Sequence, residues 1–72
     1  MKRLTALIID DERLARLNLR KHLNKFPVIE VIGEATGVDS SIKIIKEFNP
    51  DIIFLDIQLA DGNGFDIFDK IE

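Results

Sequence analysis

Apolar runs and periodic apolar positions divide the chain into alternating strands and helices. Some runs are continuous and too short for a buried helix, and their lack of alternation predicts strands covered on both faces. The predicted strands cover residues 4–9, 28–35 and 52–55. Apolar residues that recur every three or four positions predict the helices. These helices cover residues 12–26 and 38–48, and a third begins at Gly64 after a loop over 59–63.

The alternation of strands and helices predicts the fold class. Strand–helix units of this length indicate an α/β fold with a doubly wound parallel sheet, right-handed crossovers and the strand order 2-1-3. The third strand would then lie at an edge, although its sequence is typical of a central strand. No glycine cap or proline marks an end to the third helix. We therefore expect residues 1–72 to be the N-terminal portion of a longer domain.

The apolar stripes of the helices identify the side chains expected to be buried. In the first helix the stripe is Ala15, Leu19, Leu23 and Phe26. In the second it is Val38, Ile42, Ile45 and Phe48, with Asp39 or Ser40 as the N-terminal cap. In the third it is Phe65, Phe68 and Ile71, with Ile67 beside it.

Composition narrows the chemistry that the chain can support. Its 72 residues contain no cysteine and one histidine, His22, which excludes disulfides, thiolate metal sites and multi-histidine zinc centres. No apolar run approaches the ~20 residues that a membrane span requires. The basic start is followed by too short an apolar run for a signal peptide. We expect a cytoplasmic protein without membrane contact, in which His22 is a partly buried helix residue.

Two predicted strands run directly into acidic residues. Asp10 and Asp11 follow the first strand, and Asp56 follows the third. Because function in open α/β sheets lies outside the carboxyl ends of the strands, we expect these carboxylates to converge there. Crowded like charges repel unless a cation lies among them, and Mg²⁺ prefers oxygen ligands. The pattern predicts a hard-metal site with a nucleophilic aspartate, whereas Glu12 is equally suited to the start of the next helix.

The residues at these strand ends carry a family resemblance. Ile8-Ile9-Asp10-Asp11-Glu12, Phe54-Leu55-Asp56-Ile57-Gln58-Leu59 and Asn63-Gly64-Phe65 resemble the receiver domain of two-component response regulators. The stretch from Asp10 to Arg16 is similar to receivers that precede LytTR-type DNA-binding domains. The resemblance covers the whole chain but only the first part of a receiver. It implies a flavodoxin-like (CheY-like) α/β fold.

The same resemblance implies roles for individual residues. Asp56 would be the phosphoacceptor, taking a phosphoryl group from a phosphohistidine on a sensor histidine kinase. Asp11 and Asp56 would bind Mg²⁺ through their side chains, the backbone carbonyl of Gln58 would add a ligand, and Asp10 would act through a metal-bound water. The phosphoryl group would be relayed to an output domain, expected to bind DNA and not present in these residues.

Departures from the family pattern also carry expectations. Ala60 replaces the usual proline, which would loosen the loop after the phosphoacceptor, and Asn63 replaces a common aspartate. The family's switch serine or threonine and its phosphate-neutralising lysine fall beyond Glu72. Because these groups read the phosphate, we expect residues 1–72 alone not to signal normally.

Charge and exposed apolar residues suggest partner surfaces. The net charge is −3, and the acidic half after residue 26 argues against direct nucleic-acid contact. The basic side chains of the first helix form a solvated face or a kinase-docking surface; they are Arg13, Arg16, Arg20 and Lys21. Leu14 and Leu17 point away from the core stripe. A homodimer through this helix or through the third strand is therefore an alternative.

Two further functions compete with phosphoacceptance. A haloacid-dehalogenase-like phosphatase also uses an aspartyl phosphate, but its second aspartate is replaced here by Gln58. An assembly fragment without phosphotransfer would instead pair through its apolar third strand.

Overall fold

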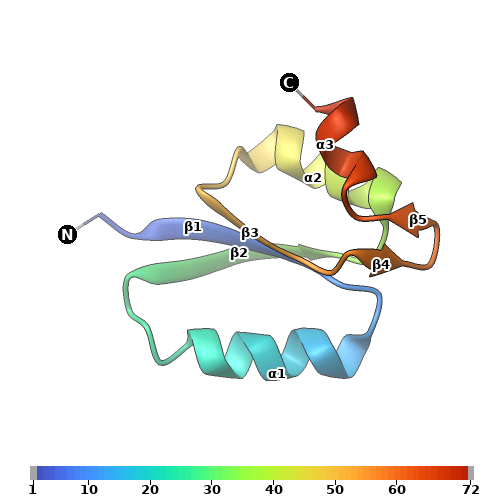
Figure 1. Cartoon of the computed structure of the whole chain (residues 1–72). Helices are drawn as coiled ribbons and strands as arrows, with labels where there is room; N and C mark the ends of the chain where they lie inside the picture. The colour runs from blue at the N-terminus through green and yellow to red at the C-terminus, as the bar shows by residue number, and fades with distance from the viewer. Residues whose placement is uncertain (1, 72) are drawn as a thin grey trace.

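A three-stranded parallel sheet forms the centre of the structure, a computed structural model that describes residues 2–71. The strands in spatial order are β2 (Ile29–Ala35), β1 (Leu4–Ile9) and β3 (Ile52–Leu55). Helix α1 (Arg13–Leu23) lies on one face, with α2 (Val38–Phe48) and α3 (Asp66–Lys70) on the other (Figure 1). A short hairpin, β4 (Gln58–Leu59) and β5 (Gly62–Asn63), joins β3 to α3. The predicted α/β fold with strand order 2-1-3, and with β3 at an edge, is confirmed.

The register of the sheet brings the ends of its strands level. Ile9 pairs with Ala35 of β2 on one side and with Leu55 of β3 on the other. One residue of β2, Ile32, is bulged out, because Ala6 pairs with Val31 while the next residue of β1 pairs with Gly33. The bulge leaves the carboxyl ends aligned, so the loops that follow all three strands leave from one edge of the sheet.

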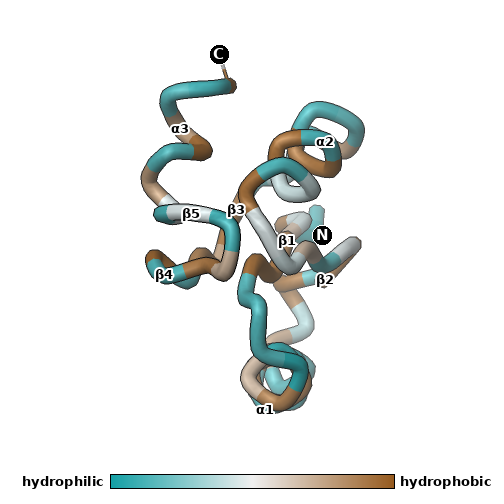
Figure 2. The backbone as a smooth tube through the Cα atoms, turned by 90° about the vertical axis from the view of Figure 1, so that its right-hand side faces the viewer, coloured by the Kyte–Doolittle hydropathy of each residue, from teal (hydrophilic) through white to brown (hydrophobic). Residues whose placement is uncertain are grey.

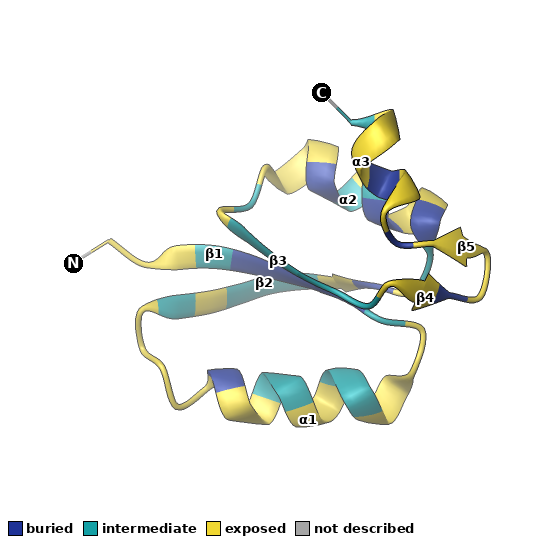
Figure 3. Cartoon of the chain, in the orientation of Figure 1, coloured by how far each residue is buried: buried dark blue, intermediate teal, exposed yellow. Residues whose placement is uncertain are grey.

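Strand β1 is the most buried element, which explains why its sequence does not alternate. Ala6, Leu7, Ile8 and Ile9 are each at most 1% exposed, since helices cover both faces of the sheet (Figure 3). Burying one such leucine or isoleucine contributes about 1.5–3 kcal/mol relative to exposure. Viewed end-on, the sheet lies between α1 and α2, with α3 beside α2 (Figure 2). The central strand is therefore the most firmly placed support for a site at this edge.

Helix α1 is shorter than its apolar pattern predicts. It ends at Leu23, and hydrogen-bonded turns carry the chain on to Phe26, whose side chain is 54% exposed. The prediction that Phe26 extends the buried stripe is therefore wrong. Ala15 and Leu19 are only half-buried. His22, in the last turn of the helix, is exposed rather than partly buried, so that prediction is wrong too.

The ends of helix α2 also differ from expectation. Its N-cap is Gly37, and neither Asp39 nor Ser40 occupies that position. Asn49 closes the helix in the left-handed conformation, with φ of 46°, just before Pro50. Phe48, the last residue of the helix, is 46% exposed and does not belong to the core cluster, so its predicted burial is wrong.

The segment after β3 is more ordered than the predicted loop, and α3 buries a different face. Ile67 is 1% exposed and joins the core cluster with Val38 and Ile45 of α2, whereas Phe65 and Phe68 are 57% and 49% exposed. The prediction that the two phenylalanines form the buried face is wrong. Helix α3 has only five residues, so its spacing does not define a stripe and contact with α2 decides the face.

A pair of polar residues ties β1 to the start of β3. The carboxylate of Asp51 accepts hydrogen bonds from the Thr5 N–H at 2.9 Å and the Thr5 hydroxyl at 3.1 Å. These bonds, from the backbone first and then from the side chain of Thr5, lower the pKa of Asp51. The pair fixes the amino ends of the strands as the register fixes their carboxyl ends.

No helix among residues 2–71 combines the length and apolar content needed to cross a bilayer.

Replacing Ile67 by alanine is expected to lower the free energy of unfolding by about 2–5 kcal/mol, the range for a fully buried isoleucine. The matched change Phe65→Ala is expected to cost less than about 1 kcal/mol, because that side chain faces water. Urea unfolding of the two variants measures the difference. Equal losses would contradict the observed face of α3.

The Asp51→Asn variant is expected to show a pH-dependent loss of stability. Because the folded-state pKa of Asp51 lies below its unfolded value, its contribution is full above the unfolded pKa of about 4 and is lost as the pH falls through the folded value. The stability gap between wild type and variant should therefore be widest near neutral pH and close on acidification. Thermal unfolding across the acid range measures this gap, and a gap independent of pH would show that the carboxylate charge does not matter.

Candidate metal and phosphoacceptor site

The backbone of the sheet places two aspartates side by side. The Asp56 N–H donates to the Ile9 carbonyl at 2.9 Å, and the Asp10 N–H donates to the Ala35 carbonyl at 3.1 Å. The parallel ladders thus continue one residue beyond the assigned strands. Asp10 and Asp56 are consequently held by the rigid sheet, although both belong to the loops that follow it.

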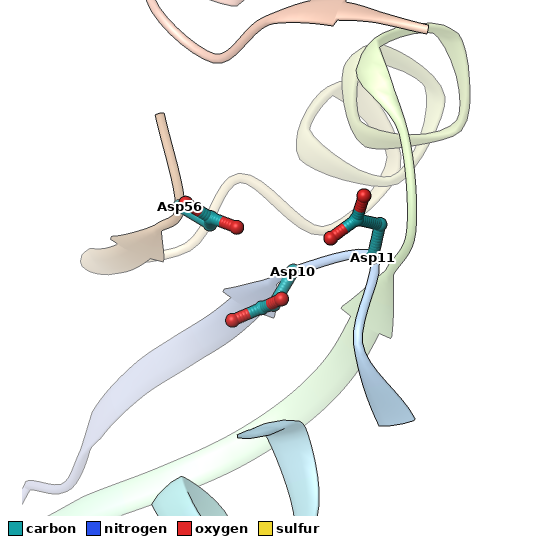
Figure 4. A group of neighbouring side chains, drawn as sticks. All are labelled: Asp10, Asp11 and Asp56. Carbon is teal, nitrogen blue, oxygen red and sulfur yellow. The ribbon is translucent and has the colours of Figure 1, made fainter. Parts of the chain in front are cut away.

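Three carboxylates converge at this edge. Each of Asp10, Asp11 and Asp56 offers an oxygen, and these oxygens all lie within 4.8 Å of one another. The Asp11 and Asp56 side chains point toward one another from the loops after β1 and β3, with Asp10 below them in the view (Figure 4). Asp11 is exposed, and the other two are half-buried. All three residues predicted from the sequence are therefore brought together.

The spacing of these charges suits a hard divalent cation. Two like unit charges about 4 Å apart repel by about 1 kcal/mol in water and by about 4 kcal/mol at the dielectric typical near a protein surface. A cation among them replaces this repulsion with attraction. The donors are all carboxylate oxygens, which fits Mg²⁺ or Ca²⁺ better than softer metals. The residues present therefore fit the Mg²⁺ that the sequence predicted.

Short loops fix the orientation of two of the carboxylates. Oδ1 of Asp10 accepts a hydrogen bond from the Glu12 N–H at 2.9 Å, and Oδ1 of Asp56 accepts one from the Gln58 N–H at 3.2 Å. In both, the aspartate side chain accepts a hydrogen bond from the backbone N–H two residues later in the chain, an arrangement that is common in turns. Glu12 itself is the N-cap residue of α1 but makes no side-chain cap bond.

A cleft of about 700 Å³ opens beside the carboxylates. Its polar lining includes Asp10, Asp11, Glu12, Asp56 and Gln58. Its apolar lining comes from the sheet and from α1, through residues such as Ile8, Phe54, Ala15 and Leu19. The acidic cluster is thus reachable from solvent.

Gly64 packs directly against the backbone of Asp56, a role that the sequence did not reveal. A Cβ atom on Gly64 would lie 2.5 Å from the Asp56 carbonyl oxygen and 3.1 Å from the Ile57 Cα. The neighbouring Asn63 accepts a hydrogen bond from the Phe65 N–H at 2.8 Å through its side-chain oxygen. An asparagine oxygen makes this bond as an aspartate would. The Asn-Gly pair indicates a turn, but it does not indicate that this turn packs against the backbone of Asp56.

Asp61 fastens the hairpin after β3 to helix α2. Its carboxylate accepts the Val38 N–H with Oδ1 at 2.8 Å and Oδ2 at 3.1 Å. This N–H is one of the unpaired donors in the first turn of α2, where a negative charge is also favoured. A Cβ on Gly37 would lie 2.8 Å from the Asp61 oxygens, so the contact depends on glycine there. The cap comes from 23 residues away, which is why local sequence did not predict it.

Two of the four basic side chains on α1 are paired rather than simply solvated. Arg16 and Arg20 each form an ion pair with Glu34 of β2, at 2.9 Å and 2.7 Å. Partial burial acts to raise the pKa of Glu34, but the hydrogen bonds and charges of Arg20 and Arg16 together lower it. Arg13 and Lys21 are exposed, as expected for a solvated face.

Known proteins match this chain over most of its length. It is 47% identical over 64 residues to the sensory transduction protein LytT of Bacillus cereus, covering 89% of the chain and 26% of that protein. It is 38% identical over 66 residues to the transcriptional regulatory protein BtsR of Escherichia coli K12, covering 92% of the chain and 28% of that protein. The chain therefore spans between a quarter and a third of the length of these relatives.

Solved structures show the same fold. A two-component response regulator of the LuxR family from Aurantimonas superimposes with a TM-score of 0.90 over 97% of this chain and 50% of that one, at 23% identity. The response regulator domain of Thermotoga maritima CheB superimposes with a TM-score of 0.83 over 88% of this chain and 47% of that one, at 27% identity. The family of response regulator receiver domains matches residues 6–72. The chain therefore belongs to the response regulator receiver domain family.

Proposed function

We propose that Asp56 accepts a phosphoryl group from a phosphohistidine of a sensor histidine kinase. The observation that carries this proposal is the convergence of Asp10, Asp11 and Asp56 at the carboxyl ends of β1 and β3. An oxygen of the Asp56 carboxylate attacks phosphorus, the P–N bond to the histidine breaks, and its electron pair returns to the imidazole. The products are an aspartyl phosphate and a free histidine.

The placement of Asp56 supports its role as the nucleophile. Its backbone is held by the bond to Ile9 and by the close approach of Gly64, so the point from which the side chain extends is fixed. Its Oδ1 accepts a hydrogen bond from the Gln58 N–H at 3.2 Å, which orients the carboxylate. Holding a nucleophile in a fixed position is the main protein contribution to phosphoryl transfer.

We propose that Asp11 and Asp56 bind Mg²⁺ directly, that the Gln58 carbonyl adds a ligand, and that Asp10 acts through a metal-bound water. When bound, the cation neutralises charge on the phosphoryl oxygens. The hairpin supports the role of Gln58: its hydrogen bond runs from the Gly64 N–H to the Ile57 carbonyl, so Gln58 occupies a non-hydrogen-bonded position opposite Asn63. Its carbonyl is thereby left available for a ligand.

The relatives support a wider role in signalling. They include a sensory transduction protein and a transcriptional regulatory protein, each much longer than this chain. We propose that phosphorylation of Asp56 is relayed to a DNA-binding output segment of the intact protein. The absence of cysteine fits a reducing, cytoplasmic location.

The Asp56→Asn variant is expected to lose phosphorylation entirely, because an amide is not a nucleophile under these conditions. The intact protein is incubated with acetyl phosphate and Mg²⁺, and intact-mass spectrometry detects the added phosphoryl group. Asp39→Asn, at an exposed carboxylate on α2, serves as the matched control and should be labelled like wild type. Labelling of the Asp56→Asn variant at the wild-type level would refute the assignment.

Gly64→Ala is expected to slow phosphorylation and to lower stability by about 1–3 kcal/mol, the usual cost of overpacking. The added methyl group would overlap the Asp56 carbonyl, so the phosphoacceptor loop must shift. Gly33→Ala is the matched control, because its methyl group would meet only the flexible ends of the Ile44 and Leu7 side chains. Labelling rates and urea midpoints separate the two effects. A normal labelling rate in the Gly64→Ala variant would mean that the close approach does not position Asp56.

A further inference from the structure

Arg16 reaches from helix α1 to the backbone of the acidic cluster. Its Nη1 donates a hydrogen bond to the Asp10 carbonyl at 2.9 Å, and its Nε donates to Oε1 of Glu34 at 2.9 Å. The Arg16 side chain is only 15% exposed, compared with 38% for Arg20, whereas Arg13 and Lys21 of the same helix are exposed. The planar fork of its guanidinium group makes both bonds at once, which a lysine cannot do in the same geometry.

Glu34 holds Arg16 in place from the neighbouring strand. Its second oxygen accepts a hydrogen bond from Nε of Arg20 at 2.7 Å, so one carboxylate forms ion pairs with two arginines on successive turns of α1. Ion pairs between exposed groups contribute little to stability. The pair formed by Arg16 is the less exposed of the two, and it continues into the backbone of Asp10. The Arg16–Glu34 pair therefore attaches α1 to the sheet and also orients Arg16 toward the Asp10 carbonyl.

The carbonyl that Arg16 contacts belongs to the peptide bond between Asp10 and Asp11. The N–H on the other side of Asp10 is already bonded to Ala35. With both ends of Asp10 fixed, the direction in which the chain leaves β1 is set, and with it the position of the Asp11 carboxylate. Glu34 also offsets the positive charge of Arg16, so that charge competes less with a cation for the cluster.

We propose that Arg16 is a positioning residue for the acidic cluster: it fixes the Asp10–Asp11 peptide and so sets the geometry in which the carboxylates bind a divalent cation. This inference rests on the proposed function, because it concerns the same metal site. Residues that orient metal ligands without touching the metal typically contribute 10–100-fold to metal affinity. Arg20 shares the contact with Glu34 but not the contact with Asp10, and this distinguishes positioning from simple attachment.

The test compares Arg16→Gln with Arg20→Gln in the intact protein. Mg²⁺ is titrated by calorimetry, and unfolding by urea reports stability in parallel. Arg16→Gln is expected to weaken Mg²⁺ binding about tenfold, at the lower end of the range for such residues, whereas Arg20→Gln should leave binding within twofold of wild type at a similar loss of stability. Arg16→Lys should restore only part of the affinity. Equal effects of Arg16→Gln and Arg20→Gln on Mg²⁺ affinity would overturn the inference.

A second measurement needs no metal. The amide resonances of Asp11 and Glu12 in metal-free protein should shift in the Arg16→Gln variant and stay in place in the Arg20→Gln variant. If they stay in place in both, Arg16 does not position this peptide and the inference fails. If wild type fails to bind Mg²⁺ while the Asp11 resonance still responds to Arg16→Gln, the proposed function fails and the positioning contact stands.

Discussion

The alignment of β1 with β3 is the constraint on which the rest of the structure depends. A single backbone hydrogen bond, from the Asp56 N–H to the Ile9 carbonyl, extends the parallel ladder into the loop and sets two acidic residues side by side. The strands can hold this arrangement because β1 is buried on both faces. Several kilocalories of apolar burial in β1 offset the repulsion between carboxylates at its end.

The loops that carry the site are supported by contacts from distant parts of the chain. Asp61 ties the hairpin after Asp56 to α2, Gly64 allows that hairpin to pack on the Asp56 backbone, and Arg16 ties the loop after β1 to β2 through Glu34. Each contact fixes backbone rather than a reacting atom. The site is therefore preorganised by its surroundings, which is what the proposed phosphoryl transfer would require.

The sequence predicted the features that depend on a local pattern or on strand order. The alternation of strands and helices led to the sheet order. The acids that follow two of the apolar runs led to the convergence of the carboxylates. Predictions failed where tertiary contact decides. Phe48 continues the apolar spacing of α2 but does not join the core cluster, and the buried face of α3 is set by the contact of Ile67 with α2. The roles of Asp61 and Arg16 arise from partners far along the chain, which no spacing rule identifies.

If the three carboxylates form one divalent-cation site, a cation should act first on the residues that surround it. Paramagnetic broadening of amide resonances by substoichiometric Mn²⁺, a stand-in for Mg²⁺ with similar oxygen ligands, tests this most directly. We expect the resonances of Asp10, Asp11, Asp56 and Gln58 to broaden first and excess Mg²⁺ to restore them. Broadening that begins instead at the exposed acids of α3, Asp66 and Asp69, or that spreads evenly over the acidic surface, would contradict it.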